Sequence, residues 1–319
     1  MKNMWKSAIM GVVVCDALGT PVQFESREQV EANPVAGMIG YRTFNMPPGT
    51  WTDDSALTLA TMDSIIRTGQ VVDVDIMNNF VKWLDHGEFT PYGFAFDIGR
   101  GTMEAIKTYK AGASTLACGG RSAQNNGNGS LMRIMPVVLY CIEHNYDHHR
   151  AIPTIHTISA LTHAHSRACI ACGLYYFMAH AIVKCKGSLI KRMQVGLDAG
   201  FAYYEYKGYT GDELGHFDRL RNLQDFMMLY ADDIKTTGYV VDTLEAAVWG
   251  LITTANLDDC LLKLVNMGYD TDSVAAVAGG LAGLYYGYKA IPTEWWEVIQ
   301  RRGWIEDMIA KIERRQNNG

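Results

Sequence analysis

The stretch Pro47-Pro48-Gly49-Thr50-Trp51-Thr52-Asp53-Asp54-Ser55 leads from a loop into a segment with helical periodicity. Apolar and small residues recur from Leu57 to Ile65 with the 3.6-residue spacing of an α-helix, and Gly69 is a typical residue for the end of that helix. The pattern predicts a helix whose first turn carries two adjacent carboxylates flanked by hydroxyl groups.

The same spacing recurs along most of the chain. We expect further helices over residues 5–17, 76–85, 101–111, 131–144, 152–161, 166–184, 189–206, 243–255, 258–267, 273–288 and 293–316. Strand-like alternation is scarce, and Val240-Val241 is at most a short strand. Because no linker rich in proline, glycine or serine divides the chain, the sequence predicts one compact all-α domain over residues 1–319.

The composition is that of a chain with a sizeable core. Hydrophobic residues make up 48% of the 319 residues and charged residues 19%, which excludes a largely disordered chain. The net charge of −6 gives no support for nucleic acid or an anionic membrane as a partner. No stretch reaches the roughly 18 uncharged apolar residues of a membrane span. Lys2 and Lys6 precede an apolar run as in a signal peptide, but Asp16 follows that run directly and favours a buried helix.

The chain has seven cysteines, an odd number that leaves at least one thiol unpaired within the chain. A reducing, cytoplasmic compartment is the simpler interpretation. Cys169 and Cys172 form a CxxC pair within the apolar segment 168–178, without a second pair that would complete a zinc site. Buried thiols are therefore favoured over redox or metal chemistry.

A second loop, Gly268-Tyr269-Asp270-Thr271-Asp272-Ser273, also enters a helix with two carboxylates and a hydroxyl. Taken alone, either segment is typical of helix capping, because Asp, Thr and Ser satisfy free backbone N–H groups there. If the two segments meet in space, Asp53, Asp54, Asp270 and Asp272 share one site. Like charges 4 Å apart repel by about 4 kcal/mol at an effective dielectric of 20, so such a cluster takes up protons or binds cations.

The donor atoms in these two segments are all oxygens. Oxygen ligands select hard cations, so magnesium or manganese is expected rather than zinc. Two divalent ions would balance the four carboxylates, and Thr52 and Ser273 would add neutral oxygens.

Two further segments are candidates for ligand binding. Gly127-Asn128-Gly129-Ser130-Leu131-Met132-Arg133 is a glycine-bearing turn before a helix, where free N–H groups suit a phosphate, although such turns are most often only turns. Leu161-Thr162-His163-Ala164-His165-Ser166 places one or both histidines toward a ligand, or holds them as structural residues.

In this order, the segments resemble the ADP-ribosylglycohydrolase family, which includes the dinitrogenase reductase-activating glycohydrolases of bacteria. The resemblance covers nearly the whole chain and is carried by Asp16-Ala17-Leu18-Gly19, Gly49-Thr50-Trp51-Thr52-Asp53-Asp54, residues 127–133 with Pro136, Thr162-His163, Asp270-Thr271-Asp272-Ser273, residues 275–283 and Ile291-Pro292.

The resemblance implies an all-α fold with two Mg²⁺ or Mn²⁺ ions at the base of a cleft. The metal ligands implied by matching motifs are Thr52, Asp53, Asp54, Asp270, Asp272 and Ser273. The residues implied to hold the diphosphate and the distal ribose are Gly127, Asn128, Gly129 and Ser130, and His163 is implied to line the ADP-ribose cleft.

The chain departs from the family pattern at two positions. Cys15 stands where the family usually has glycine, which we interpret as a packing change. Gln23 stands where the family usually has a glutamate that serves the metals and the attacking water, and Gln cannot act as a base. Residues i and i+2 of an extended segment face the same side, so we expect Glu25 to take over that role.

The implied activity is metal-dependent hydrolysis that releases ADP-ribose from a modified protein, with arginine as the first linkage to consider. Asp53, Asp54 and Glu25 are the expected catalytic residues. Serine-linked, nucleic-acid-linked and small-molecule substrates stay open. The alternatives are an ADP-ribose-binding or toxin-neutralising module of the same fold, which Gln23 motivates, and a different two-metal hydrolase acting on phosphoesters.

Overall fold

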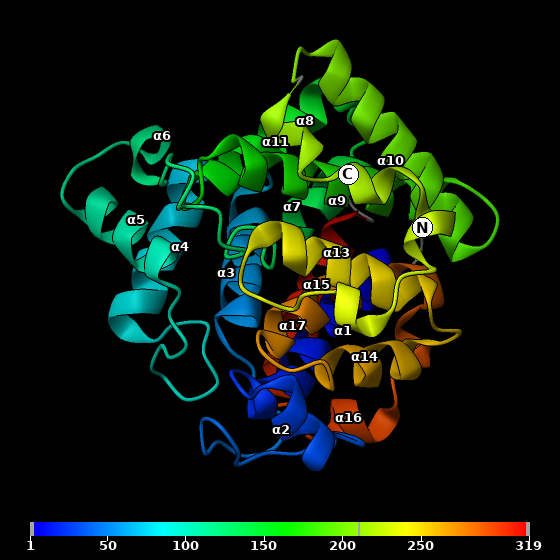
Figure 1. Ribbon diagram of the computed structural model, residues 1–319. Coiled ribbons are helices and arrows are strands. Elements are labelled where there is room, and N and C mark those ends of the chain that lie inside the picture. Colours follow the sequence, from blue (N-terminus) through cyan, green and yellow to red (C-terminus); the bar gives the residue numbers. More distant parts are fainter. Residues whose placement is uncertain (1–2, 210, 317–319) are drawn as a thin grey trace.

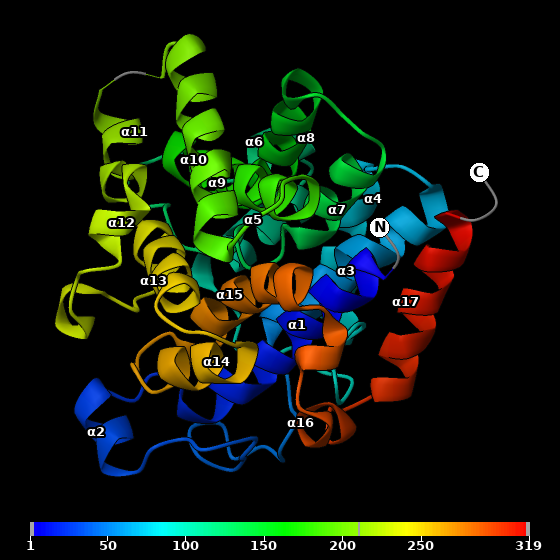
Figure 2. The same ribbon diagram turned by 90° about the vertical axis from the view of Figure 1, so that its right-hand side faces the viewer.

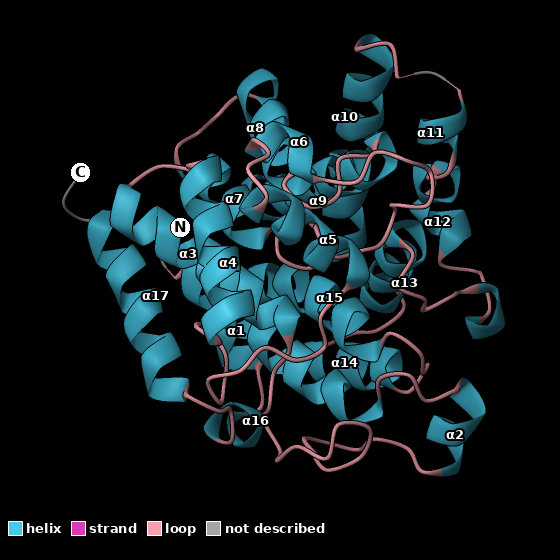
Figure 3. Ribbon diagram, turned by 90° about the vertical axis from the view of Figure 1, so that its left-hand side faces the viewer, coloured by secondary structure: helices cyan, strands magenta, loops and turns pink. Residues whose placement is uncertain are grey.

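Helices joined by loops make up the computed structural model, which describes residues 3–209 and 211–316 (Figure 1). Over those residues there is no β-strand, and the extended backbone pairs only at two isolated bridges, between Gly120 and His163 and between Gly127 and Tyr239 (Figure 3). The all-α prediction is confirmed.

The longer helices are α1 (Met4–Gly19), α3 (Asp53–Thr68), α4 (Asp73–His86), α5 (Arg100–Lys110), α7 (Met135–Glu143), α8 (His148–Ala160), α9 (Ser166–Lys184), α10 (Leu189–Tyr206), α13 (Val240–Ile252), α14 (Leu257–Val265), α15 (Thr271–Tyr286) and α17 (Arg302–Gln316). The short helices are α2 (Arg27–Ala32), α6 (Thr115–Cys118), α11 (Asp212–Gly215), α12 (Leu223–Phe226) and α16 (Thr293–Glu297). Single 3-10 turns are η1 (Thr20–Val22), η2 (Asp218–Arg221), η3 (Ala231–Asp233) and η4 (Tyr288–Ala290).

Most expected helices are present, and Gly69 ends α3 in the left-handed conformation at φ +77°. Three expectations are wrong. Residues 240–241 begin α13 instead of forming a strand. The helix expected from residue 131 begins at Met135, because Pro136 fits only the first turn of a helix.

The third correction concerns residues 293–316, which form two helices, α16 and α17, instead of one. The backbone between them is engaged by the loop before α3. The indole N–H of Trp51 donates to the Gln300 carbonyl at 2.9 Å, and the Gln300 N–H donates to the Gly49 carbonyl at 3.0 Å. These long-range hydrogen bonds take the place of helical ones.

Helices α1 and α15 lie at the centre of the molecule (Figures 1 and 2). In α1 every residue except Lys6 is buried, and in α15 every residue from Thr271 to Gly283 is buried. A helix that is buried on all sides belongs in the middle of a core. Figure 2 shows α17 on one side of this pair and α10 to α12 on the other.

Small residues let the backbones of α1 and α15 touch. A Cβ atom on Gly11 would lie 2.1 Å from the Gly279 carbonyl oxygen, so only glycine fits there. The sulfur of Cys15 packs against Gly279, where a Cβ would lie 2.2 Å from it. Toward the end of α1, a Cβ on Gly19 would lie 2.5 Å from the Asp272 Cα. The contact therefore brings the end of α1 against the start of α15.

Helix α9 is long and apolar enough to cross a membrane by length and composition, and 78% of its apolar window is buried inside the protein. The core helix of a globular protein is buried in the same way. The CxxC residues Cys169 and Cys172 lie on this helix, buried and not in a disulfide.

We expect Gly11→Ala to lower the free energy of unfolding by about 1–3 kcal/mol, because the new methyl group would overpack the α1–α15 contact. Alanine is normally the better helix residue by about 1 kcal/mol. A matched control is Gly303→Ala in α17, where a Cβ would meet no atom within 4 Å, and there stability should be unchanged or slightly raised. Urea unfolding of both variants checks this, and similar shifts in the two would contradict it.

Candidate active site

Asp16 joins the end of α1 to the start of α3. Its buried carboxylate accepts hydrogen bonds from the backbone N–H groups of Thr52 and Ser55 at 3.0 and 2.9 Å, and from their hydroxyls at 3.0 and 2.5 Å. Asp16 therefore satisfies the free N–H groups at the start of α3 from another helix. Asp53 and Asp54, in the first turn, are left available for other partners.

The capping interpretation does not describe the side chains of the two acidic segments. Neither Thr52, at the N-cap of α3, nor Asp270, at the N-cap of α15, makes a side-chain capping hydrogen bond. Instead the segments meet. The Thr52 hydroxyl lies 3.3 Å from an oxygen of Asp54 and 3.3 Å from an oxygen of Asp272, and the Ser273 hydroxyl donates to Asp54 at 3.2 Å.

Six carboxylates gather at this junction, and we call them the acidic cluster: Asp16, Asp53, Asp54 and Asp272, which are buried, and Asp97 and Asp270, which are half-buried. Burial raises the pKa of every member. In Asp53, Asp54 and Asp272 repulsion from neighbouring carboxylates adds to burial and raises the pKa well above the usual range. The pKa of Asp97 rises to about 6, with burial as the largest cause.

The acidic cluster is not neutralised by the protein. Over the described residues, no lysine, arginine or histidine forms an ion pair with any of its members. Two of its buried oxygens, Oδ1 of Asp54 and Oδ1 of Asp272, also have no hydrogen-bond partner. Buried charges are normally paired or bound to cations, so the cluster has the chemistry of a cation site.

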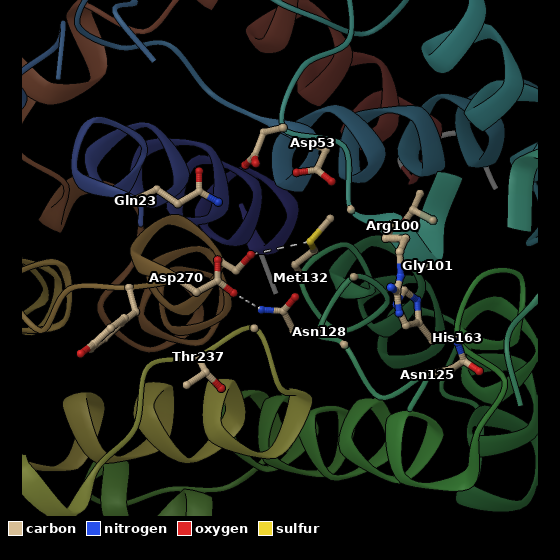
Figure 4. A pocket seen from close by; sticks show the side chains of 18 of the residues that line it. Gln23, Asp53, Arg100, Gly101, Asn125, Asn128, Met132, His163, Thr237 and Asp270 are labelled. Carbon is tan, nitrogen blue, oxygen red and sulfur yellow. Dashed lines mark hydrogen bonds between the residues drawn. The ribbon is translucent and has the colours of Figure 1, made fainter. Parts of the chain in front are cut away.

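A cavity of about 560 Å³ opens beside the acidic cluster. In Figure 4, Gln23 and Asp270 lie on one side of it and His163 and Asn125 on the other. The lining residues come from segments far apart in the chain: Gln23, Phe24, Asp53, Asp97, Gly99, Arg100, Gly101, Thr102, Gln124, Asn125, Gly127, Asn128, Gly129, Met132, His163, Thr237, Gly238, Tyr269, Asp270 and Ser273.

The predicted glycine turn forms one wall of the cavity and contacts the acidic cluster. The Asn128 side-chain amide donates to Asp270 at 2.6 Å and to the Thr243 hydroxyl at 2.9 Å. Gly127 and Gly129 line the cavity as expected. Ser130 does not, because its side chain is fully buried and its hydroxyl accepts a hydrogen bond from Ser159 at 2.9 Å. The Ser130 side chain is thus not available to a ligand, and the role of the loop backbone stays a prediction.

His163 lines the same wall as a neutral imidazole. Burial lowers its pKa to about 3, and the charge of Arg133 adds to this effect. The Thr162 hydroxyl accepts a hydrogen bond from Arg133 and lies 2.8 Å from His163 Nδ1. A hydroxyl has one proton and two lone pairs, so it can donate to Nδ1 or accept from it, and the ring tautomer follows that choice. When Thr162 donates to Nδ1, Nε2 carries the ring proton and is an uncharged donor that suits an anionic group such as a phosphate.

Other sequence candidates lie elsewhere. His165 caps α9, where its ring accepts a hydrogen bond from the Arg167 N–H at 3.3 Å. The thiol of Cys169 points to the His163 carbonyl at 3.8 Å, and burial raises its pKa to about 12, so it stays protonated. A reactive cysteine has the opposite character, exposed and with a lowered pKa.

Glu25 is not at the acidic cluster, so the expectation that it replaces the missing glutamate is wrong in position. Its carboxylate forms an ion pair with Arg42, whose Nε donates to it at 2.9 Å. Phe24, between the two positions, has φ +67°, so the segment is not the extended strand on which the i and i+2 argument depended. Gln23 faces the cavity, and its Oε1 is buried without a partner.

Asp97 is the acid that sequence analysis missed. It lies in the loop between α4 and α5, at φ +53°, and lines the cavity. The charge of Asp97 raises the pKa of Asp53 and of Asp272 more than any other neighbouring charge does. Asp97 therefore faces both acidic segments. The only signal was a single carboxylate between apolar residues Phe96 and Ile98, which has no distinctive spacing.

The chain is similar in sequence to named ADP-ribosyl hydrolases. An ADP-ribosylarginine hydrolase, Tri1, of Serratia proteamaculans (strain 568) is 30% identical over 310 residues, which is 96% of this chain and 78% of the relative. The ADP-ribosyl-[dinitrogen reductase] glycohydrolase of Rhodospirillum rubrum is 26% identical over 309 residues, which is 96% of this chain and 90% of the relative.

Among solved structures, an ADP-ribosylglycohydrolase-related protein complex contains a chain with a TM-score of 0.77 and 25% identity. The match covers 98% of this chain and 99% of that one. The sequence model of the ADP-ribosylglycohydrolase family matches residues 3–319. This protein therefore belongs to the ADP-ribosylglycohydrolase family.

Proposed function

We propose that this protein is a divalent-metal-dependent hydrolase that removes ADP-ribose from an arginine side chain of a modified protein. The observation that carries the proposal is a cavity with the acidic cluster, which has no ion pair, at one end and the glycine turn with His163 at the other. The first end suits hard cations and the second suits a diphosphate. The named activities of the Serratia and Rhodospirillum relatives support the same substrate class.

The acidic cluster fits two divalent ions by its chemistry. All candidate ligands are oxygens, from Thr52, Asp53, Asp54, Asp270, Asp272 and Ser273, and magnesium or manganese is the proposed metal. Over the described residues no three acidic, histidine or cysteine side chains are already close enough to hold an ion. We therefore expect the carboxylates, which repel one another, to close in when a cation neutralises them.

The reaction breaks the bond between C1 of the distal ribose and a guanidine nitrogen. Water supplies the oxygen that bonds to C1 and a proton that ends on the leaving nitrogen, so the products are ADP-ribose and unmodified arginine. Divalent ions would supply Lewis-acid chemistry at the acidic cluster. The protein's own residues orient the substrate, through the glycine turn and the His163 imidazole, and accept the proton of the attacking water.

We propose Asp97 as the acceptor of that proton, together with Asp53 and Asp54 as the carboxylates that position the reacting groups. Asp97 lines the cavity and is half-buried, and it faces both acidic segments. Gln23 cannot accept a proton. Its side chain hydrogen-bonds to Asp97 and Asp270, which works against the burial-induced rise of their pKa values.

Calorimetric titration with Mn²⁺ or Mg²⁺ should show two sites per chain, and Asp270→Ala should remove at least one. Asp270 is half-buried, lines the cavity and accepts a hydrogen bond from Asn128. The matched control is Asp258→Ala, which removes an aspartate in the first turn of α14 outside the cavity. If Asp270→Ala binds as many ions as the parent protein, the ligand set is wrong.

Release of free ADP-ribose from an ADP-ribosylarginine protein tests the function directly. We expect Asp53→Asn and Asp54→Asn each to reduce the rate by at least ~10²-fold, because each removes a charge beside the reacting groups and nearly keeps the shape. Cys169→Ser should keep most of the activity, since that thiol is buried and protonated. The reverse ranking would point to a thiol mechanism.

Asp97→Asn should likewise lower the hydrolysis rate by at least ~10²-fold, the size expected for a lost general base. Glu25→Gln should change the rate by less than ~3-fold, a difference worth under 1 kcal/mol, because Glu25 is paired with Arg42 outside the cavity. Steady-state rates of the two variants decide between these carboxylates. If Asp97→Asn keeps full activity and Glu25→Gln loses it, Glu25 is the catalytic carboxylate, as predicted from the sequence.

A second candidate function is an ADP-ribose-binding module without hydrolysis, and the position of Gln23 in the cavity favours it. The two functions differ in what the parent protein does. A binding module holds ADP-ribose and leaves the modified protein intact, and Gln23→Glu then introduces release. Turnover by the parent protein excludes the module.

A further inference from the structure

Two exposed aromatic side chains stand at the mouth of the cavity, at its acidic end. Phe24 and Tyr269 both line the cavity, and they are 64% and 46% exposed. Each is next in sequence to a residue that faces the acidic cluster: Gln23 precedes Phe24, and Asp270 follows Tyr269. The pair therefore forms a rim over the place where the C1 end of a bound ADP-ribose would lie.

The backbone holds both residues in an uncommon conformation. Phe24 has φ +67° and Tyr269 φ +63°, the left-handed region that bulky residues rarely adopt. Two reciprocal hydrogen bonds enforce it, from the Phe24 N–H to the Tyr269 carbonyl and from the Tyr269 N–H to the Glu25 carbonyl, both at 2.7 Å. Such conformations persist where the surrounding structure imposes them, and they gather at ligand sites.

We propose that Phe24 and Tyr269 form the subsite for the guanidinium group of the modified arginine, an inference that rests on the proposed function. The guanidine nitrogen is bonded to C1, so with C1 at the acidic cluster the arginine side chain must leave the cavity past the nearest rim. A guanidinium is planar, weakly hydrated and stacks on aromatic faces.

The rim is a poor match for the other parts of the substrate. The adenosine side of the ligand extends beyond the diphosphate, toward the glycine turn and His163 at the opposite side of the cavity (Figure 4). A serine-linked ADP-ribose has no planar cation at this point. The aromatic pair therefore favours an arginine linkage over a hydroxyl linkage and contributes little to the affinity for free ADP-ribose.

The test compares Phe24→Asn and Tyr269→Asn with the parent protein. Asparagine tolerates the left-handed conformation better than most residues, so the ring is removed without forcing the backbone to change. We expect kcat/KM for an arginine-linked ADP-ribosyl peptide to fall at least tenfold in each variant. The dissociation constant of free ADP-ribose should change by less than threefold, and Tyr269→Phe should recover most of the loss.

Tyr41→Asn is the matched control, because Tyr41 is also an exposed aromatic at φ +67° but does not line the cavity. It should leave kcat/KM unchanged. Unchanged turnover in the rim variants, or an equal loss for arginine-linked and serine-linked peptides, overturns the inference and leaves the hydrolase in place. A parent protein that releases nothing from arginine-linked peptides overturns both.

Discussion

The direct contact between the backbones of α1 and α15 is the constraint on which the rest of the structure depends. Glycine at positions 11 and 19 lets the two helix backbones touch at those positions, with only the Cys15 side chain packed between them against Gly279. The end of α1, with Asp16, is thereby placed against the start of α15, with Asp270 and Asp272. Asp16 then binds the first turn of α3 and adds Asp53 and Asp54 to the same place. Three helix ends from different parts of the chain meet because two of the helices can approach this closely.

The meeting point is electrostatically unfavourable for the protein alone. Six buried or half-buried carboxylates share it without a lysine, arginine or histidine ion pair in the described part of the chain, and two of their oxygens have no partner. Strongly raised pKa values of this kind are typical of functional sites.

The cavity has two chemically different ends, and each is supplied by its own part of the chain. Carboxylates from α3, α15 and the loop before α5 form one end, and the turn at residues 127–129 with His163 forms the other. Asn128 joins them through its hydrogen bond to Asp270. An elongated ligand with a diphosphate in the middle and a reactive sugar carbon at one end would contact both, and its leaving group would pass the Phe24–Tyr269 rim.

The helical class, most helix positions and the two acidic segments could be predicted from the amino-acid sequence, because helical periodicity and motif order are local properties. The missing family glutamate at position 23, where this chain has Gln23, could also be predicted in this way. Only the tertiary structure decided that Glu25 turns away to Arg42, that Ser130 is buried, and that Asp97 enters the acidic cluster. The direction of the Glu25 side chain depends on the left-handed backbone at Phe24. A hydrogen bond from the Phe24 N–H to the carbonyl of Tyr269, which is distant in sequence, imposes that conformation. Asp97 reaches the cluster through a loop whose path is set by packing, and no spacing in the sequence records that path.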